Sequence, residues 1–252
     1  MSHSSHPAAL SPLHQFEVKT LIPFSIGGYD LSFTNASFFM VLTVISIVIF
    51  LKFSFRKGKQ KNKEIPSKSQ MVGEMLYQFT AQQLDETAGK AGKAYFPFIF
   101  SLFLFILGAN LFGMIPYAYT VTSQLVVTFT LAMMVFLVTT CVGILRHGVH
   151  FISYFVPSGV PKFLFPLIVP IELISYLSRP ISLSIRLFAN MMAGHTMLKV
   201  FAMFTVMMGL WGIAPLLVNM LMTVFEIIVA ILQAYVFTIL TCIYLSDALY
   251  LH

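Results

Sequence analysis

The sequence Pro180-Ile-Ser-Leu-Ser-Ile-Arg186-Leu-Phe-Ala-Asn190-Met-Met-Ala-Gly-His195 decides the fold, because it sets a permanent charge inside an apolar run. The run covers residues 165–204 and is hydrophobic enough for a lipid bilayer. An arginine side chain does not lose its proton in a protein, and a charge at the bilayer centre costs at least about 2.5 to 3.5 kcal/mol. We therefore expect the function to need the charge of Arg186.

The composition agrees with a membrane location. Of the 252 residues, 58% are hydrophobic and only 10% are charged, whereas a soluble domain has roughly 25% charged residues. The two cysteines, Cys141 and Cys242, both lie inside apolar runs, which argues against a disulfide framework. Much of the net charge of +6 falls in one loop at residues 52–68. Basic residues between two apolar segments are typical of a topology signal and argue against a nucleic-acid partner.

The hydrophobic segments predict an all-α polytopic membrane protein with about five membrane-spanning helices and one amphipathic interfacial helix. The basic loop should lie on the inner side, with the N-terminus outside and the C-terminus inside. The expected segments of this single membrane domain are an outer-side arm (1–33), a first span (34–55), an inner basic loop with the amphipathic helix (56–95), a second span (96–116), a third span (122–145), an inner interfacial segment (146–165) and two long helices (166–206 and 214–250).

The length of the last two helices adds a constraint. A helix over 166–203 is about 57 Å long, whereas the hydrocarbon core is about 30 Å thick. Such a helix must be steeply tilted or shielded by protein. We expect the two long helices to form a tilted hairpin.

The amphipathic segment at 67–88 allows two interpretations. Its apolar residues recur at helical spacing, with Glu, Gln and Asp on the other face. The helix either lies at the inner membrane surface or packs on a partner subunit, and the pattern supports both equally.

The polar residues of the first long helix fall on two faces. At 100° per residue, one stripe lies within about 40° of Arg186, and His195 lies about 180° away. A stripe without Leu or Phe should face a partner or a water-filled cleft. Its other members are Glu172, Arg179, Ser182, Asn190, Ala193 and Met197.

The second long helix carries Glu226, Gln233 and Asp247. Glu226 and His195 both lie near the outer turn of the hairpin and can meet, and a carboxylate beside an imidazole can relay protons. Asp247 lies at the inner end of the same helix.

Structural readings of these residues stay open at this point. Arg186 can instead neutralise Glu172 or Glu226. Asn190, Gln233 and His195 can be ordinary hydrogen-bonding residues between helices. Asp247 can be an interfacial residue.

Three motifs resemble the subunit a family of F-type ATP synthases. Residues 182–194 are similar to the family's essential-arginine motif, residues 232–237 to its final-helix motif, and residues 110–116 to a signature in its second span. The resemblance covers essentially the whole chain. It implies a stator subunit that lies against a rotating ring of c subunits and offers two offset half-channels for protons.

By motif position, the resemblance implies that Arg186 faces the rotor carboxylate, with Asn190 and Gln233 as its neighbours. His195 and Glu226 match the outer half-channel pair. Glu172 and Asp247 resemble the acids of the inner half-channel.

The resemblance also implies partners and a location. The partners are the c-subunit ring, the peripheral-stalk subunit b, the other ATP synthase subunits and membrane lipids, with no cofactor and no metal. The His195 and Glu226 order, together with Asp247, indicates an alphaproteobacterial or mitochondrial member. The location is therefore a bacterial inner membrane or, alternatively, a mitochondrial one.

Two rival functions remain at this stage. A self-contained ion-coupled secondary transporter would use Glu172, Arg186 and Glu226 as a substrate site, but the internal repeats expected of such a transporter are not evident. A passive membrane anchor would leave the buried ionisable groups unexplained. The chain has no Walker A pattern, so no ATP site of its own is expected. The choice between protons and sodium ions stays open.

Overall fold

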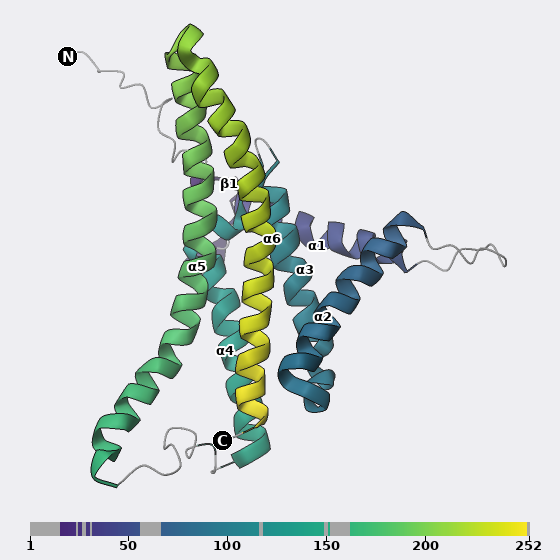
Figure 1. The fold of residues 1–252 in the computed structure, drawn as a ribbon, viewed down its shortest axis with the longest axis vertical. Helices are drawn as coiled ribbons and strands as arrows, with labels where there is room; N and C mark the ends of the chain where they lie inside the picture. The colour runs from purple at the N-terminus through teal and green to yellow at the C-terminus, as the bar shows by residue number, and fades with distance from the viewer. Residues whose placement is uncertain are drawn as a thin grey trace, which may run out of the picture.

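The structure is a computed structural model that describes residues 16–23, 25–26, 29–30, 32–55, 67–115, 118–148, 151 and 162–250. Within these residues it has five helices long and apolar enough to cross a membrane, which confirms the predicted all-α polytopic class (Figure 1). The main helices are α1 (Asn35–Ser54), α2 (Lys68–Gly92), α3 (Phe96–Gly113), α4 (Leu125–His147), α5 (Phe165–Met207) and α6 (Ile213–Leu249).

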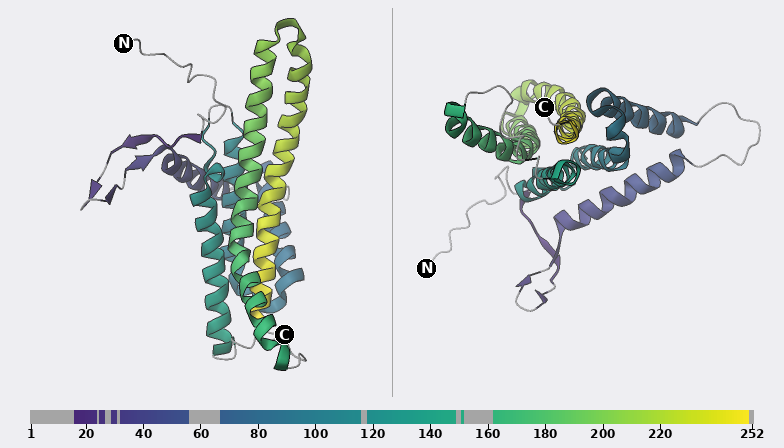
Figure 2. Two further views of the ribbon diagram at one scale, coloured as in Figure 1. Left: turned by 90° about the vertical axis from the view of Figure 1, so that its left-hand side faces the viewer. Right: turned by 90° about the horizontal axis from the view of Figure 1, so that it is seen from below.

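Helices α5 and α6 form a long hairpin, joined by the short helix η7 (Gly209–Gly212). They lie side by side in every view, and their common end projects beyond the rest of the molecule (Figures 1 and 2). The tip of the hairpin is apolar and exposed, with Leu210 at 92% and Trp211 at 81%. The 43 residues of α5 give a helix of about 65 Å. The hairpin is therefore far longer than a membrane core, and its tilt in a bilayer remains a prediction.

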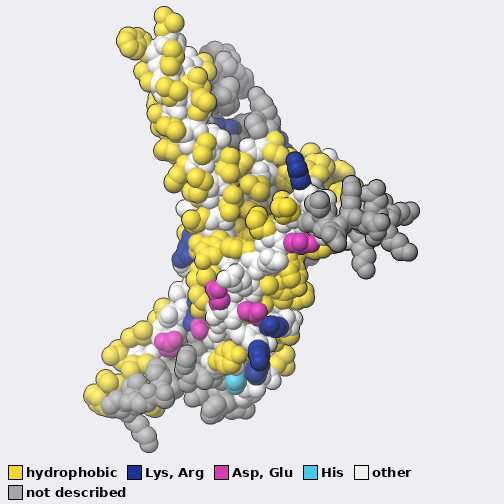
Figure 3. Space-filling model, turned by 45° about the vertical axis from the view of Figure 1, so that its right-hand side comes forward, with side chains coloured by type: hydrophobic (Ala, Val, Ile, Leu, Met, Phe, Trp, Pro, Cys, Tyr) yellow, Lys and Arg dark blue, Asp and Glu magenta, His cyan; other side chains and the backbone are white. Residues whose placement is uncertain are grey.

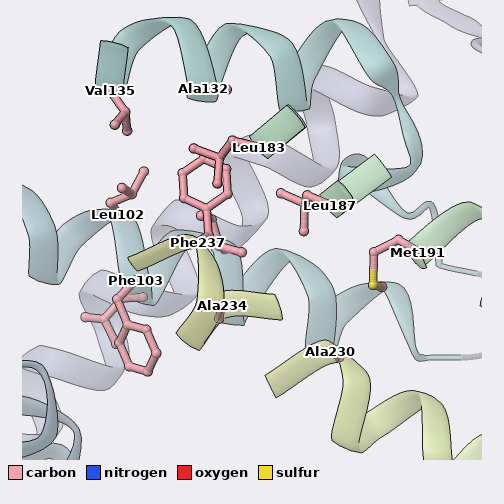
Figure 4. Close-up of a cluster of buried hydrophobic side chains, with 12 residues drawn as sticks. Leu102, Phe103, Ala132, Val135, Leu183, Leu187, Met191, Ala230, Ala234 and Phe237 are labelled. Atoms are coloured by element: carbon pink, nitrogen blue, oxygen red, sulfur yellow. The ribbon is translucent and has the colours of Figure 1, made fainter. Parts of the chain in front are cut away.

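The main core lies where α5 and α6 pack on α3 and α4 (Figure 4). Leu183, Leu187 and Met191 form one buried row of α5, four residues apart, because residues at that spacing share a helix face. On α6, Ala230 and Ala234 are fully buried small residues that let the neighbouring helices approach closely. The other buried members are Leu102, Phe103, Leu104, Ile106, Ala132, Val135 and Phe237.

Helix α2 does not lie only at a surface. Its Leu84 and Ala88 are buried in a second core with Ile99 of α3 and Leu245 of α6. Of the two interpretations of this segment, neither anticipated packing on the chain's own last helix. Met71 and Met75, at the start of α2, remain exposed at 58% and 61%. The amphipathic pattern is therefore split between an exposed first half and a buried second half.

Helix α2 continues into α3 through a kink at Gly89, with φ 57° and ψ −154°. This left-handed φ favours glycine, which has no Cβ to clash with the backbone. The helix η3 (Lys93–Tyr95) completes the connection.

The described part of the N-terminal arm contains strands that the sequence did not predict. They form two short antiparallel pairs, in which β1 (Thr20–Ile22) pairs with β4 (Phe33–Thr34) and β2 (Ser25–Ile26) pairs with β3 (Tyr29–Asp30). Strands of two or three residues are too short for a readable alternation of polar and apolar residues.

The arm is fastened to the first helix by Asn35. The Asn35 side chain accepts a hydrogen bond from the Lys19 backbone N–H at 3.1 Å and donates one to the Glu17 carbonyl at 3.1 Å. The arm also contacts the connection between α3 and α4, where Gln124 donates a hydrogen bond to the Phe16 carbonyl at 3.0 Å.

Some predictions lie outside the described residues. These are residues 1–15 of the arm, residues 56–66 of the basic loop and most of the interfacial segment 146–165.

On the face shown in Figure 3, the projecting end of the hairpin is hydrophobic, and most of the visible charged side chains lie below it.

Candidate functional site

The central pair of the site is His195 of α5 and Glu226 of α6. The His195 Nδ1 lies 3.3 Å from the Glu226 Oε1, and their side chains are only 9% and 4% exposed. A Cβ at Gly194 would lie 2.6 Å from Glu226 Oε1. The pair therefore depends on a glycine next to the histidine, because any larger residue would collide with the carboxylate.

The other ring nitrogen of His195 contacts Thr120. The Thr120 Oγ1 lies 2.9 Å from His195 Nε2 and 3.4 Å from the Gly113 carbonyl oxygen. Neither carboxylate oxygen of Glu226 has a hydrogen-bond partner within the part of the chain that the structure describes. The described polar contact of this carboxylate is thus the 3.3 Å approach of its Oε1 to His195 Nδ1.

A cavity of about 820 Å³ opens next to this pair. It is large enough for water and has several polar walls, both of which ordered water requires. His195 and Thr120 line it together with the start of α1, the N-terminal arm and the halves of α5 and α6 nearer to η7. Its other polar lining residues are Glu17, Lys19, Asn35, Tyr119, Lys199, Asn219 and Thr223.

Two of these lining residues, Asn219 and Tyr119, can form hydrogen bonds inside the cavity. The side-chain oxygen of Asn219 is buried without a hydrogen-bond partner among the described residues, so a water molecule in the cavity fits there. Burial raises the pKa of Tyr119 above its usual 10, so this phenol stays neutral and can donate a hydrogen bond.

Lys199 is a charged cavity residue that the sequence analysis missed. It lies one helical turn beyond His195, on the same face of α5, and is partly buried. A lysine inside an apolar run is the signal that could have identified it.

Arg186 and Asn190 lie on the opposite side of α5 from His195. Both are exposed, together with Ser182, Ala193 and Met197, whereas His195 is buried. Arg186 forms no ion pair with any described residue of the chain. The structural reading in which it neutralises Glu172 or Glu226 therefore fails within the described residues.

Gln233 does not share the exposed surface of Arg186 and Asn190. It lies on α6 and is only 5% exposed. The burial of Gln233 could not be predicted from the sequence, because the facing side of α6 depends on how the helices pack.

Arg179 is less exposed than Arg186. It turns inward and pairs with Asp247 of α6, with its Nη1 3.0 Å from Asp247 Oδ2. Its guanidinium lies 5.3 Å from the ring centre of Tyr176 and 4.8 Å from that of Tyr244. Arg179 and Arg186 both act electrostatically on Tyr244, so the ion pair and the two aromatic rings add contacts that the helix angles did not predict.

Glu172 is half-buried and stands apart from this group. Among the described residues it has neither an ion pair nor a hydrogen bond. The structure thus brings Asp247 together with Arg179 and does not bring Glu172 into contact with either.

Asn110 ties the site to the core. This fully buried side chain donates a hydrogen bond to the Ala230 carbonyl of α6 at 3.0 Å and accepts one from the Thr122 hydroxyl at 2.8 Å. It therefore fixes α3, α6 and the short helix η4 (Val121–Ser123) in register next to Thr120.

The described residues contain no cluster of three or more His, Cys, Asp or Glu side chains suited to a metal ion.

Comparison with known proteins gives one consistent result. The family model described as "ATP synthase A chain" matches residues 37–246. A protein of Pelagibacter ubique named "ATP synthase subunit a" is 54% identical over 246 residues, which is 97% of this chain and 99% of that protein. Proteins with the same name from Agrobacterium fabrum and Parvibaculum lavamentivorans are 53% and 54% identical, and each alignment covers 96% of this chain and 98% or 94% of the relative.

Proposed function

This chain belongs to the ATP synthase A chain family, and on that premise we propose how its residues carry protons. The protein is a multi-pass membrane subunit of an ATP synthase. We propose that it provides two offset aqueous half-channels and one fixed arginine against a rotating ring of c subunits.

The outer half-channel is the cavity that reaches His195. The observation that carries the proposal is this cavity of about 820 Å³, whose wall includes the buried imidazole of His195, with the Glu226 carboxylate 3.3 Å behind that ring. Water can bring a proton to the ring, and an imidazole bonded to a carboxylate can pass it on. The route then continues from Glu226 toward the rotor.

Arg186 separates the two half-channels. Its guanidinium keeps its proton at any physiological pH, so it cannot relay protons itself. Its exposed position on α5, together with Asn190, supports a role at an interface with a partner. There it attracts an ionised carboxylate of the ring and blocks direct proton transfer between the half-channels. Gln233, which is buried on α6, supports the packing of that helix.

The inner half-channel involves Glu172 and Asp247. We propose that Arg179 fixes the position of the Asp247 side chain in this half-channel through their 3.0 Å contact. Glu172, which is half-buried, is the second acid of the proposed inner pathway.

The proposed setting follows from the family. The partners are the c ring, the peripheral-stalk subunit b and membrane lipids, and the chain has no catalytic site of its own. We place it in a bacterial inner membrane, with the N-terminus outside and the C-terminus inside. One charge crossing 100 mV provides only about 2.3 kcal/mol, so several protons must pass for each ATP.

The test is proton pumping by the complete complex in reconstituted vesicles. Arg186→Ala should abolish ATP-driven pumping while the complex still assembles. Arg146→Ala, which removes an exposed arginine at the end of α4, is the matched control and should pump normally. Coupled pumping by the Arg186→Ala complex would sink the proposal.

A second variant tests the outer half-channel. Glu226→Gln should slow pumping and passive proton conduction without opening a leak. Glu74→Gln neutralises a carboxylate of α2 that is bonded to Gln70 and should leave the rate unchanged. A wild-type rate in Glu226→Gln would remove this residue from the pathway. A secondary transporter would instead keep its transport without the ring.

A further inference from the structure

We propose that Thr120 is a positioning residue for proton movement through His195. Its hydroxyl keeps the imidazole hydrogen-bonded in both of the proton arrangements that the pair with Glu226 can adopt. This inference rests on the proposed role of His195 and Glu226 in the outer half-channel.

The hydroxyl of Thr120 is held in a fixed place. Thr120 is only 5% exposed, and its carbonyl accepts a hydrogen bond from the Ser123 hydroxyl at 2.6 Å. A Cβ at Gly113 would lie 2.7 Å from the Thr120 methyl carbon and 2.9 Å from its hydroxyl oxygen. The glycine of α3 therefore makes the space into which this side chain fits, and the side chain reaches His195 Nε2 at 2.9 Å.

The first proton arrangement applies when Glu226 is ionised. The His195 Nδ1–H then donates to the carboxylate, and the bare Nε2 accepts a hydrogen bond from the Thr120 hydroxyl. A threonine hydroxyl can play this part because it holds one proton and two lone pairs.

The second arrangement applies when Glu226 carries a proton. The carboxyl O–H then donates to Nδ1, Nε2–H donates to the Thr120 oxygen, and the hydroxyl proton turns toward the Gly113 carbonyl at 3.4 Å. The two arrangements differ by one proton. A hydrated excess proton from the cavity binds the Thr120 oxygen as the hydroxyl proton passes to Nε2, the Nδ1–H bond breaks, and an O–H bond forms on Glu226.

The position of the hydroxyl suits this role. Thr120 and His195 both line the cavity, so the proton reaches Nε2 at its wall. The hydroxyl acts as a donor in one arrangement and as an acceptor in the other, with the Gly113 carbonyl taking its proton in the second. A side chain that only donates or only accepts would leave Nε2 without a partner in one of the two arrangements.

The experiment compares two replacements of Thr120 in the complete complex. Thr120→Val keeps the shape and removes the hydroxyl, and Thr120→Ser keeps the hydroxyl. The matched control is Thr43→Val, because Thr43 is equally buried but its hydroxyl bonds only the Phe39 carbonyl of its own helix at 2.7 Å. Passive proton conductance is measured as a function of outer pH and is normalised to the amount of assembled complex.

The expected result is a fall in conductance of at least about tenfold in Thr120→Val, with a displaced pH profile. Thr120→Ser and Thr43→Val should stay within about twofold of the wild type, because neither removes a bond to His195. Rescue by serine separates the hydroxyl from a packing role. If Thr120→Val does not assemble, Thr120→Cys replaces it, since a thiol is a weak donor and acceptor and should conduct less than serine.

Two results would overturn the inference. One is wild-type conductance and an unchanged pH profile in Thr120→Val, and the other is an equal loss in the serine and valine variants. Glu226→Gln, measured alongside, distinguishes this failure from a failure of the proposed function. If Glu226→Gln conducts normally, the outer pathway itself is wrong; if it is slow while Thr120→Val is normal, only the role of Thr120 is wrong.

Discussion

Replacing Gly194 by alanine should separate His195 from Glu226 without touching either residue. A Cβ at this position would lie 2.6 Å from Glu226 Oε1 and 2.8 Å from its Cδ, whereas ordinary contacts of a Cβ begin at 3.4 Å. The carboxylate is the far end of a flexible side chain, so it can move. It must retreat from α5 by about 0.8 Å to reach ordinary contact.

This retreat is enough to break the pair. The Nδ1–Oε1 separation of 3.3 Å becomes about 4 Å, beyond the reach of a hydrogen bond. We expect proton conductance to fall about tenfold, which corresponds to about 1.4 kcal/mol in the barrier. Stability should change little, because alanine is favoured over glycine in a helix by about 1 kcal/mol and overpacking costs about 1 to 3 kcal/mol.

The assay is passive and ATP-driven proton transport in vesicles, normalised to assembled complex. Gly108→Ala is the matched control, since it adds the same methyl group to α3, 3.2 Å from a Thr43 carbon and away from His195. Shortening the acid in Gly194→Ala/Glu226→Asp should restore part of the rate. Wild-type transport in Gly194→Ala, or a fall just as large in Gly108→Ala, would refute the reasoning.

Two further predictions concern stability. Arg179→Gln and Asp247→Asn should each lower the thermal midpoint of the complex. Because the two side chains form one ion pair, a double-mutant cycle should give a coupling energy of about 0.5 to 3 kcal/mol. Additive losses would show that the pair contributes nothing to stability. Asn110→Leu should cost about 1 to 3 kcal/mol, because it leaves the buried Thr122 hydroxyl without its acceptor and removes one hydrogen bond to the Ala230 carbonyl. Thermal unfolding measures this cost, with Asn110→Asp as the variant that still accepts from Thr122, and a loss below 1 kcal/mol would contradict the expectation.

Much of the architecture was predictable from the sequence, because hydrophobic length and helical period act locally. The apolar runs predicted five spanning helices and a long final hairpin, and the structure has both. The angle between Arg186 and His195 on one helix placed them on opposite faces, and the structure exposes one and buries the other. The antiparallel order of the hairpin also indicated that His195 and Glu226 can meet.

The rest depended on packing between segments far apart in the chain. Thr120 reaches His195 from the connection between α3 and α4, 75 residues away in sequence, and nothing in its own neighbourhood marks it. The contacts of Arg179 with Asp247 and two aromatic rings also depend on how α5 packs on α6. Gln233 is buried because of the way α6 meets its neighbours.

The exposure of Arg186 has a consequence for assembly. A chain alone in the bilayer would present this guanidinium to lipid, at a cost of at least about 2.5 to 3.5 kcal/mol. Lipid would respond by thinning and admitting water around the charge, next to a helix that already borders an open cavity on its other face. A neighbouring protein surface that covers Arg186 would remove this cost, so the isolated subunit should be less stable in a bilayer than the assembled one.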